Sequence, residues 1–277
     1  MVSALRFDKP PPATPATRRL RWLILVTAVA TVLVDVANLA YSPEAGFGLA
    51  VRTCWALLRA LGFLFLMREV RFGRLGARPF GLILAATTVF AVARLTQPRE
   101  HGFLPVWQVL AGLAALTVLC GLIVWMLYRS PAIEAHLTRR PPRRRLPPWV
   151  VTARVAALSY APLLLIPCLV AVGTLFDQPR LSRTVAVPLV LAWLVAAVVL
   201  GTLTSIVSFA VLFGKRWARV LLAGLSVLVL LVLPALCWLL LGLDGLVRDG
   251  APLIFSSLLC LYALRRSRAD PGGRSPA

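Results

Sequence analysis

Eight apolar runs, separated by short basic or proline-containing segments, limit what this chain can fold into. They cover approximately residues 20–41, 49–67, 79–96, 104–128, 150–176, 184–213, 218–242 and 251–264. A helix needs about 20 apolar residues to cross the hydrocarbon core of a bilayer. The first seven runs reach or approach that length, whereas the eighth is short and is either a span or a re-entrant or interfacial segment. The runs predict an all-α membrane protein with eight transmembrane helices.

The overall composition agrees with this fold class. Hydrophobic residues make up 60% of the 277 residues and charged residues only 14%, with a mean hydropathy of +0.85. A soluble domain of this size does not require so much apolar material. A net charge of +20 would suggest nucleic-acid binding in a soluble protein. Here most basic residues lie in short segments between apolar runs, so we expect anionic lipid headgroups, and not nucleic acid, as their partners.

The positions of the basic residues predict the topology. If the N-terminus is cytoplasmic, the inner segments and their helix borders hold 22 of the 30 Lys and Arg residues. The outer loops then hold only Arg99, Arg180, Arg183 and Arg248. This asymmetry follows the positive-inside rule and predicts that both termini are cytoplasmic, in a multi-pass protein of the cell (plasma or inner) membrane. The first apolar run is too long for a cleavable signal, so we interpret it as an uncleaved anchor.

The inner segments divide the chain into regions. Residues 129–149 form a cytoplasmic linker rich in arginine and proline, which is expected to be extended and poorly packed. This linker separates a first four-helix unit, 20–128, from a second four-helix unit, 150–264. The basic and proline-rich N-terminus, 1–19, and the basic tail, 265–277, are expected to be disordered.

A short basic sequence occurs once in each half. It reads Phe-Gly-Arg-Leu-Gly-Ala-Arg at residues 72–78 and Phe-Gly-Lys-Arg-Trp-Ala-Arg at residues 213–219, with four identities in seven positions. Each copy lies between the second and third apolar runs of its half. The recurrence favours a parallel tandem repeat, since four helices per unit give both halves the same orientation. The alternative is that the positive-inside rule alone places arginine-rich turns at these points.

The second copy also carries a family resemblance. Gly214, Lys215, Trp217, Ala218 and Arg219 resemble an inner turn of uncharacterised multi-pass integral membrane proteins of high-GC bacteria. The resemblance implies a bacterial membrane protein and no particular activity. In the first copy a glycine replaces the tryptophan, so the resemblance covers the second turn better than the first.

Ionisable side chains inside a membrane are candidates for function, because each costs roughly 2.5–3.5 kcal/mol to insert. The second run follows the first after a short loop, so the two are expected to form antiparallel neighbouring helices. Asp35 would then lie between Arg52 and Arg59 and pair with one of them. The predicted polar cluster consists of Asp35, Asn38, Arg52, Arg59 and Arg94.

Three interpretations of this cluster are open. It is a structural ion pair that lowers the cost of burial, a polar pocket open to the outside for an anionic solute or lipid headgroup, or a set of arginines that snorkel to the interface. The first half alone would carry any such pocket, because the second half lacks a matching acid.

Two further groups of residues are candidate contact sites. Small residues at four-residue spacing in the sixth run predict a helix-packing seam, with a solute-lining stripe as the alternative; these are Gly201, Thr204, Ser205 and Ser208. The linker arginines predict contacts with anionic lipid headgroups, although a purely topogenic role also accounts for them; these are Arg139, Arg140, Arg143, Arg144 and Arg145.

The residue types that catalysis requires are scarce. The two histidines, His101 and His136, fall in loops on opposite sides, and the five cysteines all lie in apolar runs. We therefore predict no catalytic residue, cofactor or metal site. The sequence favours a non-enzymatic membrane subunit or accessory factor that contacts other membrane proteins. The alternatives are a small transporter or channel for an anionic or amphipathic solute, using Asp35, Arg52 and Arg59, and an intramembrane enzyme acting on lipid.

Overall fold

The chain forms a bundle of helices, and a computed structural model describes residues 12–40, 47–93, 106–138, 147–176 and 180–269. Within these ranges the secondary structure is helical and contains no strand. The elements are α1 (Pro15–Ala40), α2 (Phe47–Arg71), α3 (Ala77–Ala93), α4 (Val106–Arg129), α5 (Pro131–Thr138), α6 (Pro148–Leu158), α7 (Tyr160–Phe176), α8 (Arg183–Leu212), α9 (Arg216–Gly245), the π-helix η3 (Leu246–Gly250) and α10 (Ala251–Ala269).

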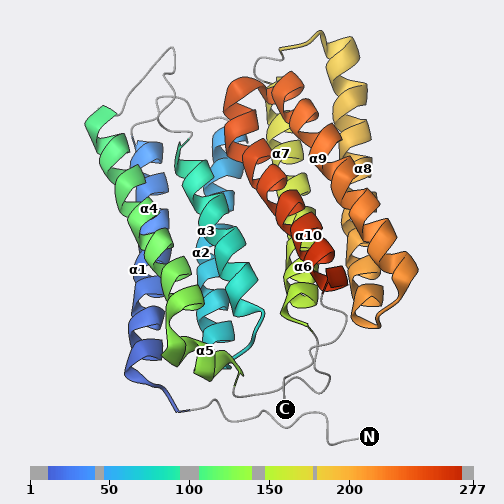
Figure 1. Cartoon of the computed structure of the whole chain (residues 1–277). Coiled ribbons are helices and arrows are strands. Elements are labelled where there is room, and N and C mark those ends of the chain that lie inside the picture. The colour runs from blue at the N-terminus through green and yellow to red at the C-terminus, as the bar shows by residue number, and fades with distance from the viewer. Residues whose placement is uncertain (1–11, 41–46, 94–105, 139–146, 177–179, 270–277) are drawn as a thin grey trace, which may run out of the picture.

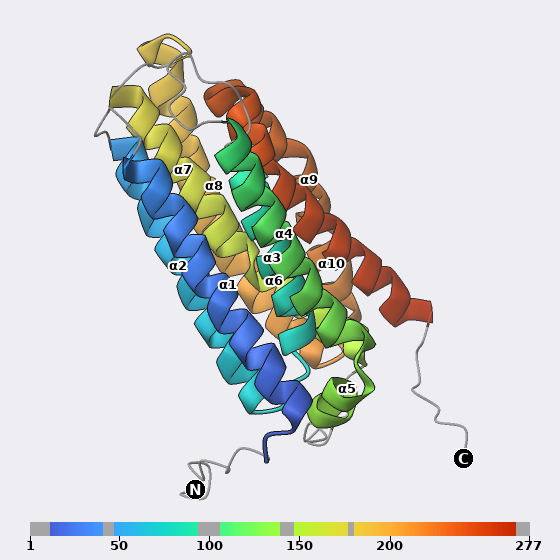
Figure 2. The ribbon, with the colours of Figure 1, turned by 90° about the vertical axis from the view of Figure 1, so that its left-hand side faces the viewer.

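The long helices run side by side between two ends of the molecule (Figures 1 and 2). The beginning of α1 and the end of α10 lie at the same end, which we call the basic end. Within the described part of the chain, six helical segments are long and apolar enough to cross a membrane, and α3 is a shorter apolar helix. The six are Pro15–Ala37, Trp107–Arg129, Pro148–Phe176, Arg183–Leu212, Arg216–Leu243 and Leu246–Ser267. By length and composition they indicate a multi-pass membrane protein.

Two hydrophobic cores follow the order of the chain. One core lies within α1 to α5, which we call the N-terminal bundle, and the other lies almost wholly within α6 to α10, the C-terminal bundle. In the N-terminal bundle α1 contacts α2, α2 contacts α3, α3 contacts α4, and α4 contacts α1. The C-terminal bundle closes in the same cyclic order, from α6 and α7 through α8, α9 and α10 back to α6. The bundles meet where α2 and α3 pack against α6, α7, η3 and α10.

The last helical rod is longer than the eighth apolar run predicts. Helix begins before residue 251 and continues to Ala269, and Leu246–Ser267 is long enough to cross a membrane. The prediction that places Arg248 in an outer loop is wrong, because this residue lies in η3 and is buried. The two adjacent charges Arg248 and Asp249 interrupt the apolar sequence before residue 251. In the structure they form an ion pair within the helix.

The linker between the two predicted four-helix units also contains structure that the sequence did not predict. Residues Pro131–Thr138 form α5, where an extended chain was expected. Proline at the first position of a helix is favourable, because its missing N–H would be unpaired there anyway. Ile133, His136 and Leu137 belong to this helix and are buried. His136 therefore does not lie in a loop. The remaining linker residues, 139–146, lie outside the described residues.

The two copies of the repeated sequence form the same glycine turn. Gly73 and Gly214 adopt φ angles of +66° and +73°, a conformation that glycine reaches without strain. The Gly73 N–H donates to the Val70 carbonyl at 3.1 Å, and the Gly214 N–H donates to the Val211 carbonyl at 3.0 Å. Each turn therefore ends one helix and starts the next with the same local hydrogen bond.

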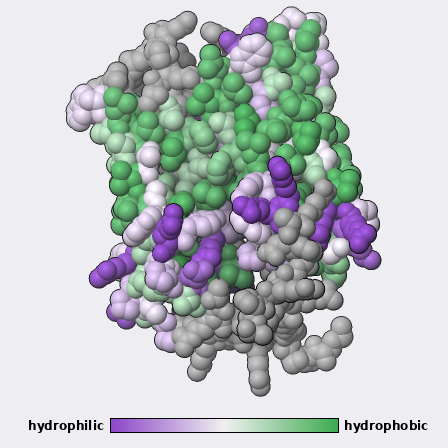
Figure 3. All heavy atoms as spheres, in the orientation of Figure 1, coloured by the Kyte–Doolittle hydropathy of each residue, from purple (hydrophilic) through white to green (hydrophobic). Residues whose placement is uncertain are grey.

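Many large apolar side chains are exposed on the surface of the described helices. On the face drawn in Figure 3, hydrophobic residues cover the middle and upper parts, while hydrophilic residues gather mainly towards the basic end. Large apolar side chains on α8 and α9 are exposed along the length of these helices, among them Val195, Ile206 and Leu231. A belt of this kind is suited to contact with lipid acyl chains.

Candidate functional site: a buried charge cluster between the two bundles

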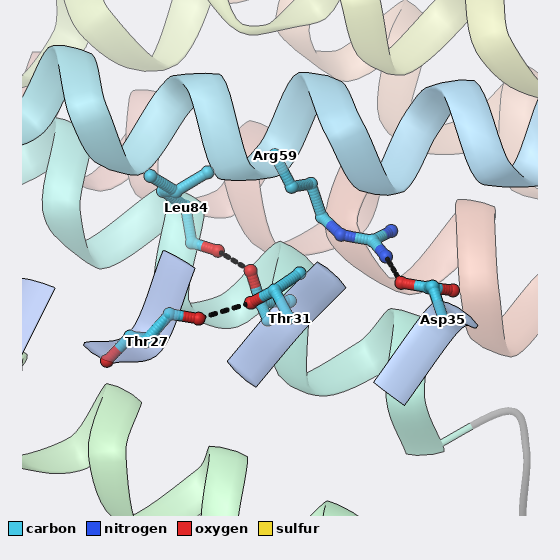
Figure 4. A network of polar contacts seen from close by, with 6 residues as sticks. Thr27, Thr31, Asp35, Arg59 and Leu84 are labelled. Atoms are coloured by element: carbon cyan, nitrogen blue, oxygen red, sulfur yellow. Dashed lines mark hydrogen bonds and ion pairs between the residues drawn. The ribbon is translucent and has the colours of Figure 1, made fainter. Parts of the chain in front are cut away.

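The inner face of α1 carries a line of polar side chains. Thr27, Thr31 and Asp35 are spaced by four residues and therefore lie on one face of the helix (Figure 4). The Thr27 hydroxyl donates to the Leu23 carbonyl and the Thr31 hydroxyl donates to the Thr27 carbonyl, both at 2.8 Å. The two fully buried threonines are thus satisfied by their own helix. Only the Asp35 carboxylate requires a partner from another helix.

Arg59 of α2 supplies that partner. Its Nη2 atom donates to Oδ2 of Asp35 at 2.9 Å, and the Arg59 side chain is 3% exposed while that of Asp35 is 19% exposed (Figure 4). The Arg59 Cζ atom also lies 5.7 Å from the centre of the Trp55 ring, within cation–π range. Arg59 is therefore held by a carboxylate and an aromatic face, and its Nε atom finds no hydrogen-bond partner among the described residues.

The other predicted members of the polar cluster are not placed. Asn38 and Arg52 belong to α1 and α2, but their side chains lie outside the described part of the chain, as does the whole of Arg94. Of the two candidate partners of Asp35, Arg59 forms an ion pair with it.

Sequence reasoning missed a second ion pair. Arg248 and Asp249 of η3 are 5% and 4% exposed, and Nε of Arg248 donates to Oδ2 of Asp249 at 2.7 Å. The Nη2 atom of Arg248 contacts the same oxygen. Asp249 is therefore a further acid inside the helical bundle, and it is more deeply buried than Asp35. The sequence could have indicated this pair, because an arginine and an aspartate are adjacent at positions 248 and 249 and can form an ion pair within one helical turn.

A glycine sets the direction in which η3 leaves α9. Gly242 adopts a φ of +74°, which breaks the regular helix four residues before η3 begins. The guanidinium of Arg180 lies directly against Gly242, in the space that a side chain would occupy. Its Nη1 atom also donates to the Trp238 carbonyl at 3.5 Å, near the end of the regular part of α9. π-Helical turns of this kind are rare and frequently occur at functional sites.

The two ion pairs belong to one electrostatic cluster. η3 packs against α3 of the N-terminal bundle, and Arg59 interacts electrostatically with both Asp249 and Arg248. The buried charge cluster, defined as Asp35, Arg59, Arg248 and Asp249, thus lies near the contact between the two bundles. Its two positive and two negative charges sum to zero. Such balance is needed because an uncompensated charge in a low-dielectric interior costs several kcal/mol.

A separate polar group lies inside the C-terminal bundle. The Tyr160 hydroxyl donates to Oγ of Ser226 at 2.9 Å, and the Ser226 hydroxyl donates to the Leu222 carbonyl at 2.8 Å. The Ser159 hydroxyl, at the break between α6 and α7, reaches Oγ of Ser256 at 3.3 Å. These neutral contacts join α7 to α9 and the α6–α7 junction to α10. They provide hydroxyl groups but no base that would activate one of them.

The predicted packing seam lies on α8. Gly201, Thr204 and Ser208 are buried, and the hydroxyls of Thr204 and Ser205 donate to the Leu200 and Gly201 carbonyls at 2.7 Å. A Cβ atom on Gly201 would lie 3.2 Å from Cβ of Ala161 on α7. The small residue therefore permits α8 to approach α7 closely.

The remaining predicted sites give no further geometry. The five linker arginines and His101 lie outside the described residues. Among the residues that the structure does describe, no group of three His, Cys, Asp or Glu side chains is placed to hold a metal ion. Comparisons with protein-family models, with curated proteins and with solved structures give no match for this chain. Its function therefore has to be inferred from its own residues.

Proposed function

We propose that this chain is a non-enzymatic integral membrane protein of a bacterial cell membrane, which acts as a subunit or accessory factor through contacts between helices. The observation that carries the proposal is the neutral buried charge cluster. Each guanidinium is paired with a carboxylate of its own bundle, and the two pairs lie near the contact between the bundles, which favours a role in holding helices together. The buried hydroxyls of Thr31 and Thr204 likewise donate to backbone carbonyls of their own helices.

The proposed topology has eight spans, with both termini in the cytoplasm. In addition to the six candidate spans, α2 and α3 run between the same two ends of the molecule (Figure 1). Exposed basic residues at the basic end include Arg18, Arg68 and Arg216, whereas those described at the opposite end are Arg180 and Arg183. This asymmetry supports a cytoplasmic orientation of the basic end.

A tandem duplication of a four-helix unit accounts for the two halves of the chain. The same cyclic order of helix contacts in both bundles supports it, as does the shared glycine turn at Gly73 and Gly214. The units would be related by a parallel repeat, because each contains an even number of spans.

A transporter or channel for an anionic or amphipathic solute is the second candidate. It is favoured by the position of the buried charge cluster at the contact between two repeated bundles, where transporters commonly place their substrate sites. Asp35 is the more exposed partner of its ion pair. Movement of one bundle against the other would exchange the partners of Arg59 between Asp35 and Asp249.

Co-purification from native membranes separates these two functions. The tagged full-length protein is extracted in mild detergent, and bound proteins and small molecules are identified by mass spectrometry. A partner protein at a fixed stoichiometry supports the subunit role. Recovery of the protein alone, together with uptake of an anionic solute by proteoliposomes that D35N abolishes in a folded protein, contradicts the subunit role and supports transport.

A further inference from the structure

A groove of about 550 Å³ opens at the beginning of α1, at the basic end of the molecule. Its described lining consists of Pro15, Arg18, Arg19, Trp22, Leu23 and Val26. The groove lies away from the buried charge cluster, which is formed further along α1. The described lining also contains none of the linker arginines, which the sequence predicts to contact lipid headgroups.

The polar part of the groove is strongly cationic. Arg18 and Arg19 are adjacent and exposed, and the described lining contains no carboxylate. Neither arginine forms an ion pair with a residue that the structure describes. The guanidinium of each arginine presents several N–H donors that match the oxygens of a phosphate group. This end of the groove therefore favours a ligand that carries a phosphate and net negative charge.

The apolar part of the groove continues along the outer face of α1. Arg18, Trp22 and Val26 are spaced by four residues and lie on the same face of the helix. The face continues with Val29 and Leu33, and the side chains of Trp22 and Leu33 are 65% and 61% exposed. At 1.5 Å per residue, the distance from Trp22 to Leu33 is about 16 Å, close to the thickness of one hydrocarbon leaflet.

We propose that this α1 groove binds an anionic glycerophospholipid, with the phosphate on Arg18 and Arg19 and an acyl chain along the stripe from Trp22 to Leu33. The order of the residues matches the order of the groups in such a lipid. An indole at the position of Trp22 suits the boundary between headgroups and acyl chains. An acidic peptide would satisfy the arginines but would leave the apolar stripe unused. The inference rests on the proposed membrane embedding and names one lipid partner.

The full-length protein in nanodiscs tests the α1 groove. The discs contain equal amounts of dioleoylphosphatidylglycerol and dioleoylphosphatidylcholine, and native mass spectrometry counts the lipids that stay bound after the protein is released. We expect retention of phosphatidylglycerol by the wild-type chain. Removal of both guanidiniums in R18Q/R19Q is expected to weaken that binding about 25-fold, at about fivefold for each arginine.

The matched control is R265Q/R266Q. It removes the same charge from exposed residues at the same end of the molecule, on α10, outside the described lining of the groove. We expect it to retain phosphatidylglycerol as the wild type does. Equal losses in the two double variants would overturn the proposal, because they would reflect diffuse attraction between the basic end and the anionic lipid. Unchanged binding in R18Q/R19Q would overturn it as well.

Two further measurements address the two parts of the ligand. W22A keeps both arginines and is expected to reduce phosphatidylglycerol retention severalfold, because the indole that covers the ester region of the lipid is lost. Soluble glycerol phosphate at millimolar concentration is expected not to displace the lipid. Displacement would overturn the lipid assignment in favour of a phosphate site. A chain that does not partition into membranes at all would contradict the proposed function, whereas an embedded chain without lipid preference contradicts only this inference.

Discussion

The charged residues in the interior are tolerated because each has a compensating neighbour. Arg59 contacts the Asp35 carboxylate and the Trp55 ring, and Arg248 contacts the residue next to it in the chain. Both arginines are almost completely buried. Removing one partner of such a pair leaves the other charge uncompensated, which costs far more than the pair itself contributes. The stability of the α1–α2 contact should therefore depend on having both charges or neither.

Single neutralisation of the Asp35–Arg59 pair should destabilise the protein strongly. We expect D35N to lower the unfolding free energy by about 3–5 kcal/mol, since Arg59 would remain buried without its carboxylate. The double variant D35N/R59Q should recover much of this loss. Chemical unfolding in detergent, followed by circular dichroism, measures both changes.

The Glu69–Arg74 pair provides a matched control for this prediction. Nη1 of Arg74 lies 2.7 Å from Oε1 of Glu69, but the Arg74 side chain is 55% exposed. We expect E69Q to change the unfolding free energy by about 0–1 kcal/mol, because the Arg74 side chain that loses its partner is exposed to solvent. Similar effects of D35N and E69Q would show that burial of the charge left without a partner has no energetic consequence.

At the scale of elements, α5 distinguishes the two copies of the glycine turn. In the first copy α5 covers the turn, and Nε2 of His136 lies 3.0 Å from the Val70 carbonyl, which is also the acceptor for Gly73. In the second copy Gly214 is exposed, and a Cβ atom added to it would have no described atom within 4 Å besides those of Gly214 and its chain neighbours. The two turns thus share a backbone conformation and differ in what surrounds them.

This difference makes two equivalent glycine substitutions unequal. Both G73A and G214A place a side chain at a positive φ, at a cost of about 1–2 kcal/mol. In G73A the new Cβ would also lie 2.9 Å from the His136 carbonyl oxygen, so α5 must shift. We therefore expect a larger fall in thermal stability for G73A than for G214A. Melting curves of the two variants in one detergent measure the difference, and equal melting temperatures would contradict the packing of α5 on this turn.

At the scale of the whole molecule, the proposed topology predicts which residues face each side of the membrane. The exposed Cys54 is first replaced by serine, and the other four cysteines are buried. K215C at the basic end should then react with a membrane-impermeant maleimide only in inside-out vesicles. S182C at the opposite end should react only in right-side-out vesicles. The reverse pattern would show that the basic end faces outwards.

The long helices could be predicted from the sequence, whereas the contacts of their charged residues could be predicted only in part. Apolar runs determine where helices form in a membrane, so the limits of α1, α4 and α8 agree with the runs to within a few residues. Asp35 and Arg59 were predictable as neighbours, because a short loop makes α1 and α2 antiparallel. The burial of Arg248 and Asp249 was not predictable, since it depends on packing between bundles that are far apart in the sequence. α5 was missed because proline content suggests an extended chain unless the position of the proline at a helix start is recognised.

The placement of Arg59 has a consequence for how the protein is made. The helix that carries it, α2, has to bring a buried guanidinium into the membrane, which is costly without a counter-charge. Its carboxylate partner lies on the preceding helix, so α1 is already synthesised when Arg59 leaves the ribosome, and the two helices can enter the bilayer as a hairpin. The charges of η3 arrive only with the last helix. Ribosome-bound chains that end before η3 should therefore contain an inserted N-terminal bundle whose contact with the later bundle is still incomplete.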